Sequence, residues 1–233
     1  MEENWEILKI WKGASESKII YETEFNGILI QVKDKKYVRH LCMDRKKTRQ
    51  SAIWKSKPFE LQMQYLRDIV KVVDKVKDPK KILVLGLGGG CLATYLYRTL
   101  PTAHIDVVEI IPELKDIAHK YFSMPDDPRL NVIISDARDF LEDGMESPDD
   151  GDQKYDLIFM DVFGVSSIPK KFQTAKFYNL LQNTLNDGGY AAFNTWVSRT
   201  SSGKYLERLN SVFGEVIEAH SPLSGNHIAF CRG

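Results

Sequence analysis

From Lys81 onward, short runs of almost uninterrupted apolar residues alternate with stretches whose apolar residues recur at helical spacing. The apolar runs are KILVLGL, HIDVVEI, NVIIS, YDLIFMDVF, GYAAFNTW, EVIEAH and HIAFCRG. The helical stretches are 91–99, 112–122, 137–142, 170–186 and 202–213. Strands that are apolar on both faces and separated by helices are typical of a parallel sheet covered on both sides. We therefore predict an α/β fold with a doubly wound, mostly parallel, seven-stranded sheet.

Residues 1–57 follow a different pattern, with short β-prone segments and little helical periodicity. These segments are WEILKIW, KIIYETEF, ILIQVKD and KYVRHLCMD. Asn26-Gly27 is typical of a tight hairpin turn, and such hairpins need a partner because they are marginally stable alone. Residues 58–76 return to helical spacing. The chain thus divides into a small N-terminal β-strand unit (1–57) and an α/β domain (58–233).

The overall composition excludes several classes of partner. Lys+Arg and Asp+Glu balance at 32 each, so no net charge attracts nucleic acid or an anionic membrane. No apolar run is long enough to span a membrane, and the acidic N-terminus lacks the basic and apolar regions of a secretory signal. We expect a cytoplasmic protein that binds neither nucleic acid nor membrane.

The cysteines and histidines do not suggest a metal site. The three cysteines are Cys42, Cys91 and Cys231, and they lack the spacing of metal ligands, as do the five scattered histidines. Reduced thiols and no bound metal are expected. Cys91 opens a helix after a glycine-rich turn, where a thiol pKa can fall, although a packed small residue is the commoner outcome.

The glycine-rich turn lies within ILVLGLGGGCLATYL, residues 82–96. Glycines there permit positive φ angles and let a ligand approach the backbone closely. Such turns occur in dinucleotide-binding folds, P-loops and nucleoside-binding transferases, and a structural turn alone also explains them. No Gly-Lys-Ser/Thr follows, which excludes a P-loop. The dinucleotide fingerprint fits badly because its third glycine position is not occupied by glycine.

Acidic residues end the three strands that follow this turn. Glu109 can accept hydrogen bonds from two ribose hydroxyls, although a surface carboxylate is the alternative interpretation. Asp136, followed by Ala137, can contact an adenine amino group and can also cap the next helix. Asp161 would face the reacting end of the ligand, where a carboxylate orients an amine or takes its proton. The strand ends together predict one nucleoside site.

These motifs resemble those of the spermidine synthase (polyamine aminopropyltransferase) family, a branch of the Rossmann-like S-adenosylmethionine-dependent methyltransferase fold. The similarity includes LCMD…RQS, ILVLGLGGG, IDVVEIIPELKDIAHKYF, MPDDPRLNVIISDARDFL and the stretch from YDLIFMDVFG to GGYAAFN. It implies that S-adenosylmethionine or its decarboxylated form is the co-substrate, in a homodimer. The implied nucleoside contacts are Gly86, Gly88, Gly89, Glu109, Ile110, Asp136, Ala137 and Gln50, with Asp161 as the catalytic acid–base residue.

Two departures from the family pattern bear on the reaction. The family turn reads Gly-Gly-Gly-Asp-Gly-Gly, and Gly89 replaces its aspartate; Gly164 replaces a second family aspartate, which grips the diamine. Decarboxylated S-adenosylmethionine ends in an ammonium group that an aspartate stabilises, whereas the intact molecule adds a carboxylate that an aspartate repels. A turn without the acid offers backbone N–H groups to that carboxylate. Intact S-adenosylmethionine is therefore the expected ligand.

Loss of the second aspartate weakens the case for a diamine acceptor. Phe163, Trp54 and Trp196 are candidates for an apolar acceptor pocket, and each can equally be an ordinary core or rim aromatic residue. We predict an enzyme that transfers an alkyl group, with methyl slightly favoured, to an amine or another small nucleophile. The alternatives are a polyamine aminopropyltransferase proper and a catalytically silent protein that binds a nucleoside or a partner. A nicotinamide-dependent oxidoreductase is disfavoured by the poor fingerprint.

Overall fold

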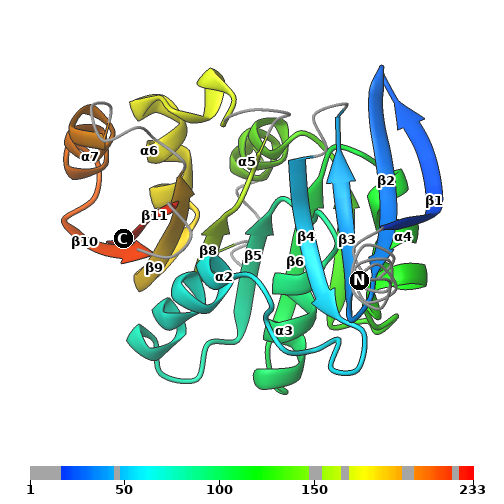
Figure 1. Cartoon of the computed structure of the whole chain (residues 1–233). Helices are drawn as coiled ribbons and strands as arrows, with labels where there is room; N and C mark the ends of the chain where they lie inside the picture. Colours follow the sequence, from blue (N-terminus) through cyan, green and yellow to red (C-terminus); the bar gives the residue numbers. More distant parts are fainter. Residues whose placement is uncertain (1–16, 45–47, 147–153, 164–167, 196–201, 222–225) are drawn as a thin grey trace, which may run out of the picture.

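A seven-stranded sheet forms the centre of the computed structural model, which describes residues 17–44, 48–146, 154–163, 168–195, 202–221 and 226–233 (Figure 1). Its strands are β5 (Lys81–Leu85), β6 (His104–Glu109), β7 (Leu130–Ile134), β8 (Tyr155–Met160), β9 (Leu185–Thr195), β10 (Glu215–Ser221) and β11 (Asn226–Arg232). They lie in the order β10-β11-β9-β8-β5-β6-β7. β5 to β9 pair in parallel, and β11 pairs antiparallel with β9 and β10. The predicted fold class is confirmed.

The strand order places a topological switch point at β5. From β5 the chain continues outward through β6 and β7, and it then returns to β8 on the other side of β5. In open α/β sheets, ligands bind outside the carboxyl ends of the strands at such a point. The carboxyl ends of β5, β6, β7 and β8 are therefore where a site is expected.

Helices cover both faces of this sheet. They are α2 (Gln64–Ile69), α3 (Cys91–Thr99), α4 (Glu113–Phe122), α5 (Ala137–Glu146), α6 (Ala175–Asn183) and α7 (Ser202–Asn210). Residues alternate between the faces along β5, so Ile82 and Val84 pack with α2, α3 and α4, while Leu83 and Leu85 pack with α5, α6 and α7. Burial on both faces explains why the central strands β5 and β8 are almost entirely apolar.

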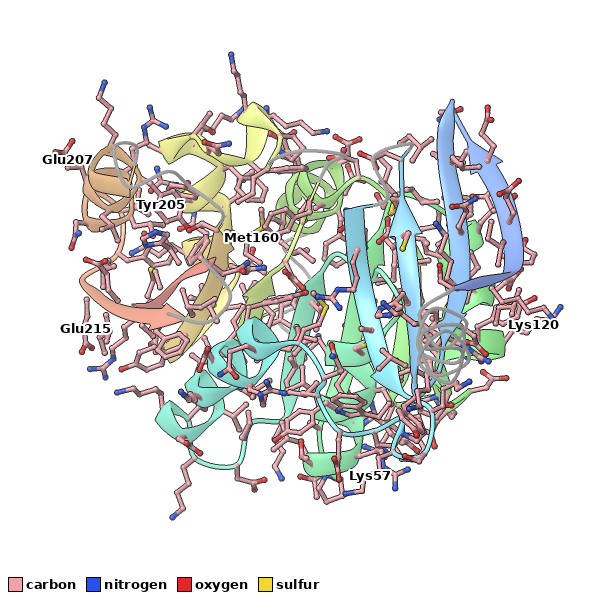
Figure 2. All side chains as sticks on the ribbon, viewed as in Figure 1. Lys57, Lys120, Met160, Tyr205, Glu207 and Glu215 are labelled. Atoms are coloured by element: carbon pink, nitrogen blue, oxygen red, sulfur yellow. The ribbon has the colours of Figure 1, made fainter. Side chains whose placement is uncertain are left out.

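The side chains show the same division between interior and surface (Figure 2). Met160, the last residue of β8, lies in the interior with 2% of its surface exposed. Lys57 and Glu207 lie at the periphery in the same view. None of the helices in the described part of the chain is long and apolar enough to cross a membrane.

The N-terminal unit is a four-stranded antiparallel sheet. Its strands are β1 (Lys18–Phe25), β2 (Ile28–Lys35), β3 (Val38–Met43) and β4 (Thr48–Trp54). Asn26 and Gly27 have φ angles of 48° and 81°, in a tight turn between β1 and β2, as the sequence predicts. Ile30, Val32 and Leu41 join the core formed by α2, α3 and α4. The first predicted segment, WEILKIW, lies outside the described residues.

Two elements differ from the sequence prediction. β4 is a strand that the sequence analysis did not predict, and its residues Gln50 and Ser51 line the cavity described below. The helix predicted over 58–76 starts only at Gln64 and continues as a 3₁₀ helix, η1 (Val70–Lys75). A turn closed by Glu60 N–H on Lys57 C=O occupies the preceding residues instead. The helix predicted over 170–186 is also interrupted, as a 3₁₀ helix η2 (Lys170–Phe172) followed by α6.

Candidate active site

A cavity of ≈ 370 Å³ opens at the carboxyl ends of β5, β6 and β8, a volume within the usual range for small-molecule sites. β4 and α2 supply the opposite wall, and the tip of the β1–β2 hairpin also lines it. Most of the sequence-predicted site residues line this cavity, namely Gln50, Gly86, Gly88, Glu109, Ile110, Asp136, Ala137, Asp161 and Phe163. Segments that are far apart in the sequence thus line one cavity.

Gly86 is required by the close approach of two strand ends. Its φ angle is 98°, a value that side chains rarely adopt. A Cβ atom there would lie 2.6 Å from the backbone oxygen of Asp161. Glycine therefore lets β5 and β8 bring their ends together beneath the cavity.

The backbone N–H groups of the turn are mostly bonded within the protein. Leu87 N–H donates to Glu109 Oε2 at 2.9 Å, Gly89 N–H to Ser51 Oγ at 2.8 Å, and Gly90 N–H to the Leu87 carbonyl. Gly88 N–H forms no hydrogen bond with another described residue. The expectation that the whole turn offers N–H groups to an anion needs correction, because Ser51 takes the one at Gly89. Gly89 itself does not line the cavity.

Glu109 holds the turn and the start of the next segment together. Its carboxylate is 8% exposed and accepts N–H groups from Leu87 at 2.9 Å, Ile110 at 2.8 Å and Ile111 at 3.0 Å. A carboxylate has about four lone-pair sites, so three bonds leave capacity for a ligand hydroxyl. Glu109 is therefore both a structural acceptor and a candidate ribose ligand, rather than a free surface carboxylate.

Replacing Glu109 with alanine is expected to weaken nucleoside binding by more than about 10-fold and to lower the melting temperature. The substitution leaves three inward-facing N–H groups without their acceptor, and each such loss typically costs about 1 kcal/mol or more. Differential scanning fluorimetry with and without S-adenosylhomocysteine measures both effects. Glu60→Ala is the control, because Glu60 is exposed and its ion pair with Lys57 is exposed as well. Equal behaviour of the two variants would contradict this role.

Asp136 has two bonded neighbours in addition to the cavity. Its Oδ1 accepts Arg138 N–H at 2.9 Å, which is the capping arrangement for α5, and its Oδ2 pairs with Lys171. Burial raises the pKa of Asp136, but the Lys171 ion pair and the Arg138 N–H outweigh it and bring the pKa below its ordinary value. The capping role and the cavity position therefore coexist, and Lys171, which also lines the cavity, accompanies Asp136 there.

Asp161 follows β8 and is held from two sides. Asn194 Nδ2, on β9, donates to Oδ1 at 2.7 Å, and the Tyr65 hydroxyl, on α2, donates to Oδ2 at 3.2 Å. Burial raises the pKa of Asp161 to about 6, although both hydrogen bonds oppose that shift. A carboxyl group with a pKa near neutrality, facing a cavity, is suited to proton transfer.

The sequence analysis did not identify Ser51, Tyr65, Asn194 or Lys171 as site residues. Tyr65 lies in the helix predicted over 58–76, where its aromatic ring suits an apolar position, and Lys171 lies in the helical stretch predicted over 170–186. Asn194 did leave a signal, since it is a polar residue directly after the apolar run YAAF, near the carboxyl end of β9.

The three aromatic residues predicted to line an acceptor pocket have different outcomes in the structure. Phe163 lines the cavity beside Asp161. Trp54 does not line it, and the prediction for this residue is corrected: it ends β4, roughly 10 Å along the strand from Ser51, and is 37% exposed. Trp196 lies outside the described residues.

Cys91 lines the cavity but is not an activated thiol. Burial raises its pKa to about 12, although hydrogen bonds to Ala52 and Ser51 oppose the shift. In the native protein at pH 8, iodoacetamide is therefore expected to leave Cys91 unmodified, and in denaturant it should label all three cysteines. Peptide mass spectrometry distinguishes the sites. Rapid native labelling at Cys91 would show that its thiolate is stabilised after all.

Relatives of two kinds match the chain. A polyamine aminopropyltransferase of Vibrio vulnificus is 32% identical over 64% of this chain and 49% of its own length. An eEF1A lysine and N-terminal methyltransferase homolog of Drosophila melanogaster is 31% identical over 72% of this chain and 26% of its own length. The chain therefore spans half or less of the length of these relatives.

Solved structures show the same fold. A probable spermidine synthase from Corynebacterium glutamicum superposes with a TM-score of 0.76 at 24% identity, covering 92% of this chain and 80% of its own. Human methyltransferase-like protein 13, in complex with S-adenosylhomocysteine (SAH), superposes with a TM-score of 0.67 at 24% identity, covering 72% and 82%. The spermine/spermidine synthase domain model matches residues 62–220, which include the glycine turn and all three strand-end carboxylates. The chain belongs to the spermine/spermidine synthase domain family.

Proposed function

We propose that this protein is an S-adenosylmethionine-dependent methyltransferase that acts on an amine or a similar small nucleophile. One observation carries the choice of donor: among the described residues that line the cavity, the only carboxylates are Glu109, Asp136 and Asp161. Glu109 and Asp136 accept backbone N–H groups at strand ends, and the Asp161 carboxylate is bonded by Asn194 and Tyr65. No acid accompanies Gly88 and Gly89, where the family places one.

The absence of an aspartate from the glycine turn discriminates between the two donors. Intact S-adenosylmethionine carries an ammonium and a carboxylate on its amino-acid tail, whereas the decarboxylated form carries only an ammonium. An aspartate within a few ångströms would repel that carboxylate by several kcal/mol in a partly desolvated site, as an order of magnitude. This turn instead presents Gly88 N–H and the start of α3, both favourable to an anion. Intact S-adenosylmethionine is thus the better match.

The residues of the chain bind, orient and accept a proton. Glu109 is placed to receive the ribose hydroxyls, and Asp136 and Ala137 line the wall suited to adenine. The bound sulfonium supplies an electrophilic methyl carbon. The amine lone pair forms the new bond to that carbon, the carbon–sulfur electrons return to sulfur, and the amine proton passes to Asp161. Positioning of this kind provides much of the rate enhancement in transfer reactions.

The acceptor end suits an acceptor with a single amino group better than a diamine. Asp161 is the one described carboxylate there, its pKa is already raised to about 6 by burial, and Phe163 lies beside it. Two aspartates at opposite ends of a slot would favour a dication. The relatives include proteins named for aminopropyl transfer and for lysine methylation, and the single carboxylate favours the second kind of acceptor.

The test compares both donors with a mixture of amines as acceptors. Isothermal titration is expected to give tighter binding of intact S-adenosylmethionine than of its decarboxylated form. Mass spectrometry of the products should show addition of a methyl group. Tighter binding of the decarboxylated donor, together with an aminopropyl product, would instead identify an aminopropyltransferase. Binding without any product from either donor would favour a catalytically silent protein.

Three further expectations belong to this proposal. The chain forms a homodimer, it acts in the cytoplasm without a metal, and its β unit and α/β domain meet near residues 57 and 58. Size-exclusion chromatography with light scattering tests the oligomeric state, and activity after treatment with a chelator tests the metal independence.

A further inference from the structure

Ser51 lies at the junction between the N-terminal sheet and the glycine turn. It belongs to β4, is 6% exposed, and lines the cavity next to Gly88 and Cys91. Its Oγ accepts the Gly89 N–H at 2.8 Å. A buried polar side chain at a cavity wall, bonded to the ligand-facing turn, points to a role in binding.

The space beside the turn is filled by the same side chain. A Cβ atom on Gly88 would lie 2.9 Å from Ser51 Oγ, and one on Gly89 would lie 2.9 Å from Ser51 Cβ and 3.1 Å from the Phe122 ring. Gly88 also has a φ angle of 53°. No aspartate can therefore enter either position unless Ser51 moves or becomes smaller. The loss of the family acid at position 89 and the presence of Ser51 are two parts of one packing arrangement.

The hydroxyl of Ser51 also bonds the Cys91 thiol, a weak acceptor that a ligand carboxylate can replace. A serine hydroxyl has one donor and two acceptor sites, and the bond from Gly89 N–H uses an acceptor site. Accepting that bond polarises the hydroxyl and strengthens its own donation. Close by, α3 begins at Cys91, where the first N–H groups of a helix lack intrahelical partners. These donors together favour an anionic group at this end of the cavity.

We propose that Ser51 selects the methyl donor, which deepens and rests on the function proposed above. Its hydroxyl donates to the carboxylate on the amino-acid tail of S-adenosylmethionine. Its bulk simultaneously excludes an acidic side chain from the turn. Ser51 thereby favours the intact donor by attraction and prevents the arrangement that would favour the decarboxylated one.

The first experiment removes only the hydroxyl. Ser51→Ala is expected to weaken binding of S-adenosylmethionine about 10-fold and to change binding of the decarboxylated donor less than about 2-fold, because only the former has the carboxylate. Isothermal titration gives both constants. Ser135→Ala is the matched control: Ser135 also lines the cavity, but it lies beside Asp136 and should affect both donors equally.

A second experiment tests the exclusion of the acid. Gly89→Asp alone should lower the melting temperature and bind neither donor well, since the new side chain meets Ser51 and Phe122. The double variant Gly89→Asp/Ser51→Gly makes room beside Ser51. Its ratio of affinities should move at least about 10-fold toward the decarboxylated donor relative to the wild type. An unchanged ratio in a folded double variant would overturn the proposal.

The outcomes separate this inference from the function on which it rests. If the wild-type protein already prefers the decarboxylated donor, the proposed function itself fails. If the wild-type protein prefers the intact donor but Ser51→Ala weakens both donors equally, or neither, then only the inference about Ser51 fails. In that case Ser51 serves to hold the turn and does not select the donor.

Discussion

Replacing Asp161 with asparagine should reduce turnover by about 10²- to 10⁴-fold, the range typical of losing a general base. Asparagine has nearly the same shape and can still bond Asn194 and Tyr65, so the cavity should keep its form. It cannot accept the proton that the amine loses. The dissociation constant for S-adenosylhomocysteine should therefore change less than about 2-fold. Single-turnover kinetics and titration measure the two quantities separately.

Asp156→Asn is the control for this substitution. Asp156 lies near the start of β8, at the opposite end of the strand from the cavity, where it accepts the N–H groups of Lys80 and Lys81. The folded fraction of this variant should retain nearly normal turnover. If Asp161→Asn also retained normal turnover, Asp161 would not be the proton acceptor.

The stability of the Asp161→Asn variant should depend on pH in a defined direction. Burial raises the pKa of Asp161 from 3.8 to about 6, so the folded protein binds this proton more tightly than the unfolded chain. The contribution of Asp161 to the free energy of unfolding therefore falls as pH rises from about 4 to about 6. At pH 8 the variant should be more stable than the wild type by roughly 3 kcal/mol, or about 6–12 °C in melting temperature. At pH 4 this gain should be absent.

Replacing Gly86 with alanine should lower the free energy of unfolding by about 3–5 kcal/mol and abolish measurable nucleoside binding. The added Cβ would lie 2.6 Å from the backbone oxygen of Asp161 and 3.0 Å from its carbonyl carbon. Backbone atoms cannot rotate aside as a side chain can. The ends of β5 and β8 must therefore separate, and Asp161 moves with them. Chemical denaturation and titration with S-adenosylhomocysteine report the two losses.

Gly27→Ala separates strain in the backbone from this steric contact. Gly27 has a φ angle of 81°, similar to the 98° of Gly86, but a Cβ there meets no atom within 4 Å. Its substitution should cost only about 1–2 kcal/mol, the price of a side chain at positive φ. A loss at Gly86 no larger than that at Gly27 would show that the strand ends separate easily.

The sequence was sufficient to predict the sheet and the meeting of its strand-end residues, which line one cavity. The central strands β5 and β8 are local apolar runs, and their burial on both faces leaves little ambiguity. The glycine turn, Glu109, Asp136 and Asp161 each come at or just after the end of such a run. Parallel strands bring their carboxyl ends to one edge, so these residues could be placed together without coordinates.

The helix starting at Gln64 was harder to delimit from the sequence. Apolar spacing extends back toward Pro58, and spacing alone does not reveal that a local turn at Lys57–Glu60 replaces the first helical residues. The prediction that Trp54 lines the acceptor pocket was wrong for a related reason. Its residue type suited an aromatic pocket, but its distance along β4 from the cavity depended on a strand that the sequence pattern had not disclosed.

What the amino-acid sequence by itself determined is the order of elements and the carboxylates that end them, because both follow from patterns within a few residues. Only the tertiary structure decided which side chains set the chemistry of those carboxylates. Tyr65 reaches Asp161 across 96 residues, Asn194 across 33, and Ser51 reaches Gly89 across 38. Such pairs form only after β4, α2 and β9 have packed around β5 and β8, and no local periodicity records that packing.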